Sequence, residues 1–146
     1  MSRRIIIITL LLTVISVLTF SNINKLSSTQ NFSCKTHRDT YSVRTLAIDA
    51  DSFQVLVADT PNKWEYGLMN VESKKDICGN DGMFFTFPIA VPQTFWNKNT
   101  LVDLNMYWMK GEKKVGQGKL PAITESGLTT ISSPEAVDGV VEIITP

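Results

Sequence analysis

From Tyr41 onward the chain consists of short apolar runs separated by residues that favour turns, and this pattern limits the fold more than any other feature. The runs are rich in β-branched and aromatic residues, which favour strands. Along residues 101–109 apolar and polar side chains alternate, which places on one face of a strand the residues Val102, Leu104, Met106 and Trp108. Short strands with regular turn signals predict an all-β domain, a mostly antiparallel small barrel or sandwich.

Six further segments have the composition of strands. They cover residues 41–49, 52–59, 82–88, 114–120, 128–133 and 137–144. The first two are expected to pair across a turn at Ala50 and Asp51, and residues 114–120 are expected to return antiparallel to residues 101–109. Pro88, followed by Pro92, is expected to end the third segment.

One short helix is predicted immediately after the strand at residues 52–59. Thr60 can cap its N-terminus, Pro61 suits its first position and Gly67 can close it in a left-handed conformation. Trp64 and Leu68 are four residues apart, so they share one helix face and should pack inward.

The N-terminus carries the clearest compositional signal. Arg3 and Arg4 precede residues 5–20, which contain no charge and no proline. A basic flank before an apolar stretch is typical of a secretory signal or a membrane anchor, here residues 1–23, and the anchor is the favoured alternative. The basic flank predicts a cytoplasmic N-terminus and a domain outside the cytoplasmic membrane, either anchored on its outer side or secreted.

The rest of the chain is expected to divide into a flexible tether, residues 24–40, and a small mostly-β domain, residues 41–146. Cys34 falls in the tether and Cys78 in the domain. An oxidising compartment would allow a disulfide between them, and two unpaired cysteines are the alternative.

Composition and motifs give no support to several classes of function. Lys plus Arg equals Asp plus Glu at 14 each, so no net positive charge favours nucleic acid. His37, the single histidine, falls in the tether, and the domain has no histidine for a catalytic triad or a metal site. We therefore expect no catalytic residues, no metal and no cofactor.

Four blocks in this order carry a resemblance to a known family. They are VADTPNKWEYGLM, DGMFFTFP, FWNKNTLVDLNMYWM and SPEAVDGVVEI, at residues 57–69, 81–88, 95–109 and 133–143. The chain resembles the uncharacterised domain of unknown function 192 family, which implies a compact, mostly β fold that is often exported. Two departures stand out: Asn97 replaces the usual Met, and Val102-Asp103-Leu104 replaces the usual Pro-Leu-Asp.

The segment FWNKNT, residues 95–100, allows two interpretations. In the first, Phe95 or Trp96 fills the core while Asn97 and Asn99 satisfy the backbone of a turn. In the second, the segment binds a small polar ligand such as a sugar or an anionic group, because aromatic faces stack on sugars and a lysine adds a positive charge. The ligand-binding residues would then be Trp96, Lys98, Asn99, Thr100 and Asp103.

The sequence therefore predicts a membrane-tethered or exported extracytoplasmic domain, a non-catalytic binding or envelope-interaction module. Its expected partners are the membrane, through the N-terminal segment, and a small polar ligand or envelope component. The alternative is a small hydrolase or lyase that acts on envelope or carbohydrate material, with Asp81 or Asp103 beside Lys98.

Overall fold

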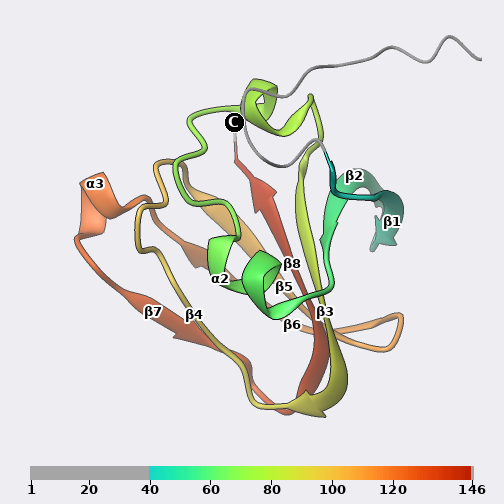
Figure 1. Ribbon diagram of the computed structural model, residues 1–146. Coiled ribbons are helices and arrows are strands. Elements are labelled where there is room, and N and C mark those ends of the chain that lie inside the picture. The colour runs from blue at the N-terminus through green and yellow to red at the C-terminus, as the bar shows by residue number, and fades with distance from the viewer. Residues whose placement is uncertain (1–39, 146) are drawn as a thin grey trace, which may run out of the picture. The chain divides into compact units, whose positions relative to one another are not determined.

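The computed structural model describes residues 40–145, which are mostly β-sheet with two short helices (Figure 1). The predicted all-β class is thus confirmed. The signal or anchor at residues 1–23 and the tether before residue 40 lie outside the described residues. Among residues 40–145, no helix has the length and apolar character needed to cross a membrane.

The larger sheet has six strands in the order β1-β2-β3-β8-β5-β6. Their bounds are β1 Val43–Ile48, β2 Asp51–Ala58, β3 Gly82–Val91, β5 Leu104–Lys110, β6 Lys113–Leu120 and β8 Val137–Ile144. All neighbours are antiparallel except β2 and β3, which are parallel. A parallel pair needs a crossover, and the chain supplies it with α2 (Pro61–Tyr66) and the 3₁₀ helix η3 (Lys74–Ile77).

Both predicted hairpins are confirmed. Ile48 pairs with Asp51 at the end of the first, so its turn is Asp49-Ala50, one residue earlier than expected. Asp49 has φ of 56°, the left-handed conformation that two-residue hairpin turns require. Lys110 pairs with Lys113 in the second hairpin, as the turn at KGEK predicts.

The predicted helix is also present, as α2. Thr60 occupies the N-cap position without a side-chain cap hydrogen bond, and Pro61 is the first residue. Gly67 ends the helix with φ of 43° and ψ of −133°, which differs from the left-handed helical conformation that was predicted. Leu68 is buried, but Trp64 is only half-buried because it lies at the edge of a pocket described below. A second short helix, α3 (Ile123–Ser126), was not predicted.

Strand β8 lies at the centre of the sheet, between β3 and β5, and is buried on both faces. A strand in this position needs apolar side chains on both sides, which explains the nearly continuous apolar run from Val140 to Ile144. Glu142 interrupts that run and is itself buried. Alternation along the strand places its side chain on the same face as Val140 and Ile144.

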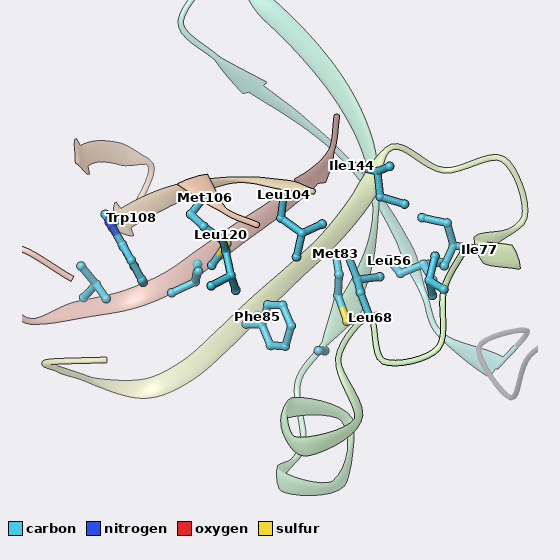
Figure 2. Packing of buried hydrophobic residues seen from close by; sticks show 14 residues of the cluster. Leu56, Leu68, Ile77, Met83, Phe85, Leu104, Met106, Trp108, Leu120 and Ile144 are labelled. Atoms are coloured by element: carbon cyan, nitrogen blue, oxygen red, sulfur yellow. The ribbon is translucent and has the colours of Figure 1, made fainter. Parts of the chain in front are cut away.

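A separate hydrophobic cluster packs on each face of the sheet. The larger cluster contains residues from β2, β3, β5, β6 and β8 and from the segments after α2 (Figure 2). It includes Leu104, Met106 and Trp108, whose burial the alternation predicts, whereas Val102 is half-buried and precedes β5. The smaller cluster comprises Ile48, Val55, Phe84, Met109, Val141 and Ile143.

Pro88 departs from expectation, whereas the strand predicted at residues 128–133 is confirmed but lies in a separate sheet. Pro88 does not end β3, which continues to Val91. The pairing with β8 shifts between Thr86 and Val91, so Pro88 does not have to donate a ladder hydrogen bond. The segment at residues 128–133 forms β7 (Thr130–Ser132), which pairs with β4 (Thr94–Trp96) in a separate two-stranded sheet. Figure 1 shows this ribbon beside the larger sheet.

Candidate functional site

A pocket of 280 Å³ lies between α2 and its following loop, the larger sheet and β4. Aromatic side chains form much of its lining, from Trp64, Phe85, Phe87, Phe95 and Trp96. Its charged and hydroxyl lining comes from Glu65, Tyr66, Thr94, Lys98, Thr100 and Glu142. Ligand pockets commonly combine aromatic walls with converging polar groups, and this pocket has both kinds of lining.

Contacts around the pocket hold its aromatic walls in place. The indole Nε1–H of Trp64 donates a 2.9 Å hydrogen bond to the carbonyl of Ala58, and the Trp64 ring lies 5.2 Å from that of Phe87. Phe85 meets Phe95 edge to face, with ring centroids 5.0 Å apart. A Cβ on Gly67 would lie 3.3 Å from the Phe85 ring, so the end of α2 packs closely against this wall.

Glu142 is the buried charged side chain of the pocket, with 4% exposure. It pairs with Met83 of β3 on one side and with Met106 of β5 on the other. Among the residues described, no buried side-chain nitrogen or oxygen lacks a hydrogen-bond partner. Buried glutamates are uncommon, so this one marks the pocket as a candidate site.

The sequence interpretation missed Glu142 as a site residue. The available signal was its place in VDGVVEII, where period-two alternation puts an acidic residue on the same face as two large aliphatic ones.

The segment FWNKNT contributes to both the core and the pocket. Phe95 packs against Phe85 and Trp108 in the core. Asn97 is fully buried and belongs to the turn that follows β4, where the amide N–H of Thr100 donates to the carbonyl of Asn97. Asn99 has φ of 55°, and its carbonyl accepts a hydrogen bond from the N–H of Asn70. Asn97 and Asn99 therefore both lie in a turn, as the first interpretation expects, but the side-chain amide of Asn97 bonds to residues outside that turn.

Three of the five predicted ligand-binding residues, Trp96, Lys98 and Thr100, come together at the pocket. Trp96 is 46% exposed, and Nζ of Lys98 lies 5.0 Å from the centre of its ring. Thr100 is buried.

Asn99 and Asp103 are not among the residues that line the pocket. Asp103 has another role: its Oδ1 accepts a 2.7 Å hydrogen bond from the N–H of Ala122, and its carbonyl accepts one from the N–H of Thr145. Asp103 thus joins the start of β5 to the segments before α3 and after β8.

A larger hollow of 550 Å³ lies beside the smaller cluster, near β1 and the β5–β6 turn. Arg44 and Asp138 line it, but each has a partner in the fold: Arg44 lies over the Phe84 ring, and Asp138 accepts the N–H of Gly111. None of the predicted site residues lies there. We therefore take the aromatic pocket with Glu142 as the candidate site.

Among residues 40–145, neither Cys78 nor a group of potential metal ligands forms a second candidate site. Cys78 is disulfide-bonded, but Cys34 lies outside the described residues, so the pairing of these two stays a prediction. Within residues 40–145, no group of three His, Cys, Asp or Glu side chains is arranged to hold a metal ion.

Comparison with known proteins identifies related sequences and folds. The family model DUF192, described as uncharacterized ACR, matches residues 44–145. A putative transcription regulator from Sinorhizobium meliloti 1021 has a similar structure, with a TM-score of 0.55 and 25% identity over 72% of this chain and 82% of that one. A protein of unknown function from Novosphingobium aromaticivorans has a TM-score of 0.49 and 17% sequence identity, and the match covers 75% of this chain and 86% of that one. No curated protein matches the sequence significantly.

Proposed function

The chain belongs to the DUF192 family, and we propose that it is a non-catalytic binding module that takes a small polar ligand in the pocket between α2, β3, β4 and β8. The observation that carries this proposal is the buried carboxyl group of Glu142 in a lining that contains several aromatic side chains. Burial of an acidic side chain has a desolvation cost, and a binding role would account for its presence at a core position.

The dimensions of the pocket support a small ligand. Its 280 Å³ lies just below the roughly 300–1,000 Å³ that is usual for ligand pockets. A single sugar ring or a molecule of amino-acid size matches this volume, whereas a longer polymer would have to lie across the rim, where Trp96 is exposed.

The residues named in the hydrolase or lyase alternative have structural partners instead. Asp81 accepts hydrogen bonds from Nζ of Lys74 and from the N–H of Gln54, both at 2.8 Å. Asp103 accepts the N–H of Ala122. Neither carboxylate lines the pocket with Lys98, so the two acids that the alternative named are not at this site; the carboxyl groups that line the pocket with Lys98 are those of Glu65 and Glu142.

The proposed setting is the outer side of the cytoplasmic membrane. Arg3 and Arg4 followed by the uncharged residues 5–20 support an anchor or a secretory signal, and an envelope component would then be the accessible ligand. The description of the Sinorhizobium protein does not alter this proposal, because balanced basic and acidic residues offer no excess charge for a phosphate backbone.

A ligand screen by thermal unfolding tests the proposal. The full chain, in uncharged detergent, is heated with a panel of sugars, amino acids, organic cations and organic anions while its tryptophan fluorescence is followed. A ligand of the folded state raises the melting temperature by mass action. We expect at least one class to do so.

The matched variants are Trp96→Ala and Ile89→Ala. Both remove an exposed hydrophobic side chain, but only Trp96 lines the pocket. Trp96→Ala should abolish the ligand-induced shift and Ile89→Ala should retain it. A screen without any stabilising ligand, or equal shifts in both variants, would refute the pocket as the binding site.

A further inference from the structure

We propose that the ligand is a small zwitterion, which places its ammonium group against Glu142 and the aromatic walls and its acidic group toward Lys98. This inference rests on the proposed binding function and adds the chemical class of the ligand. It follows from the position of each charge in the pocket.

The ionisable side chain buried in the pocket is an acid. Glu142 is 4% exposed, whereas Lys98 and Glu65 are exposed at the rim. Charges interact more strongly away from water, so an ionised Glu142 would repel an anionic group in the interior and attract a cationic group. Glu142 already takes part in a contact within the protein, but a carboxylate offers about four acceptor positions and can receive further donors.

The aromatic lining also favours a positively charged group on the ligand. Trp64 and Phe87 lie with their ring centroids 5.2 Å apart, and both rings line the pocket together with Phe85 and Phe95. The indole N–H of Trp64 is engaged by the carbonyl of Ala58, which leaves the electron-rich ring faces as its means of interaction. Such faces attract ammonium groups within about 6 Å of the ring centre.

Lys98, at the rim of the pocket, supplies a positive charge for the acidic group of the ligand. Nζ of Lys98 lies 5.0 Å from the centre of the Trp96 ring, a contact that holds this positive charge beside the pocket opening. A carboxylate or phosphate on the outer end of the ligand would meet Lys98 there. Because the pocket measures 280 Å³, the two charges of such a ligand must belong to a small molecule.

The test compares three probes that differ in charge. Glycine betaine carries both an ammonium and a carboxylate, choline carries the ammonium alone, and 3,3-dimethylbutan-1-ol is the neutral isostere of choline. Each is titrated by calorimetry into the full chain in uncharged detergent. We expect glycine betaine to bind more tightly than choline, and the neutral isostere to bind at least about tenfold more weakly than choline.

Two variants test which residue contacts each charged group of the ligand. Glu142→Gln keeps the size and polarity of the side chain, and it should weaken the binding of both ammonium-bearing probes, glycine betaine and choline, by about tenfold or more. Lys98→Ala should remove the advantage of glycine betaine over choline, because the carboxylate of glycine betaine then loses its partner. The comparison among the three probes needs no variant, so the test holds even if one variant unfolds.

The outcomes separate this inference from the proposed function. Equal binding of choline and its neutral isostere, or equal binding of glycine betaine and choline, would overturn the zwitterion. Pocket-dependent binding of sugars or anions alone would also overturn it, while the binding module would stand. If no compound of the screen or of this series binds, both proposals fail.

Discussion

Asn97 joins three segments of the chain through one buried amide. Its Nδ2 lies 2.8–3.0 Å from the carbonyls of Pro121 and Gly127 and from Oγ of Ser126, and its Oδ1 accepts the N–H of Thr129. These contacts hold the turn after β4 against the α3 segment. The departure from the family's usual Met at this position therefore has a structural role in this chain.

Replacement of Asn97 should therefore lower the free energy of unfolding. Asn97→Ala leaves several backbone groups without their partners, and each such buried group costs about 1–3 kcal/mol. We expect a loss of about 3 kcal/mol in the free energy of unfolding, measured by chemical denaturation. Lys98→Ala, one residue along and exposed, should stay within about 0.5 kcal/mol. Similar losses in the two variants would contradict the role of the Asn97 amide.

At the scale of elements, the start of β5 shows two kinds of contribution to stability. Leu104 is buried in the larger cluster, while Asp103 is exposed but binds backbone groups on both sides of β5. Alternation alone predicts that Asp103 matters little. The hydrogen bonds show that a residue on the solvent side of a strand end can still fix two neighbouring segments.

Substitutions at this pair should separate packing from hydrogen bonding. Leu104→Ala should destabilise by about 2–5 kcal/mol, because it leaves a cavity in the core. Asp103→Ala should cost about 1–2 kcal/mol through the lost acceptor for Ala122, and Asp103→Asn, which keeps an acceptor oxygen, should cost less. Equal values for Asp103→Ala and Asp103→Asn in denaturant unfolding would show that this hydrogen bond is unimportant.

Asp81, which immediately precedes β3, should make the free energy of unfolding depend on pH. Desolvation, the largest single effect, raises the pKa of Asp81, but the hydrogen bonds from Lys74 and from the N–H of Gln54, with the charge of Lys74, outweigh it and lower the pKa overall. The folded pKa is thus below the unfolded value of about 3.9, so Asp81 stabilises the fold above that pH. This stability is lost as the pH falls through the folded pKa.

A melting series between about pH 5 and pH 3 measures this effect. The melting temperature of the wild type should fall more steeply over this interval than that of Asp81→Asn, whose side chain does not ionise. Parallel curves would show that Asp81 does not couple folding to protonation.

At the scale of the whole molecule, local patterns predicted most of the elements and both hairpins but not the order of the strands in the sheet. The strands and α2 were predictable because alternation and turn residues are encoded in neighbouring positions. The insertion of β8 between β3 and β5, and the parallel pairing of β2 with β3, depend on contacts between distant segments.

This difference also explains the outcome for the site. Trp96 and Lys98 were suggested by their local composition. Alternation in VDGVVEII is a local signal for Glu142, but its burial follows from the central position of β8, which buries both faces of the strand.

The proposed location can be tested on the intact chain. An alkaline phosphatase fused after Pro146 should be active, because the basic flank at Arg3 and Arg4 keeps the N-terminus in the cytoplasm and sends the domain across. A green fluorescent protein fused at the same position should be dark when exported unfolded. A fluorescent fusion with an inactive phosphatase would place the domain in the cytoplasm instead.

The central claim is that ligand binds at the aromatic pocket, and the three tryptophans of the chain test it most directly. Trp64 and Trp96 line the pocket, whereas Trp108 is buried in the core and does not. With tryptophan labelled by ¹⁵N, each indole N–H gives its own NMR signal. On titration with a ligand from the screen, we predict that the Trp64 and Trp96 signals shift together and saturate while that of Trp108 stays in place. Saturable binding without a shift at Trp64 and Trp96 would contradict the account.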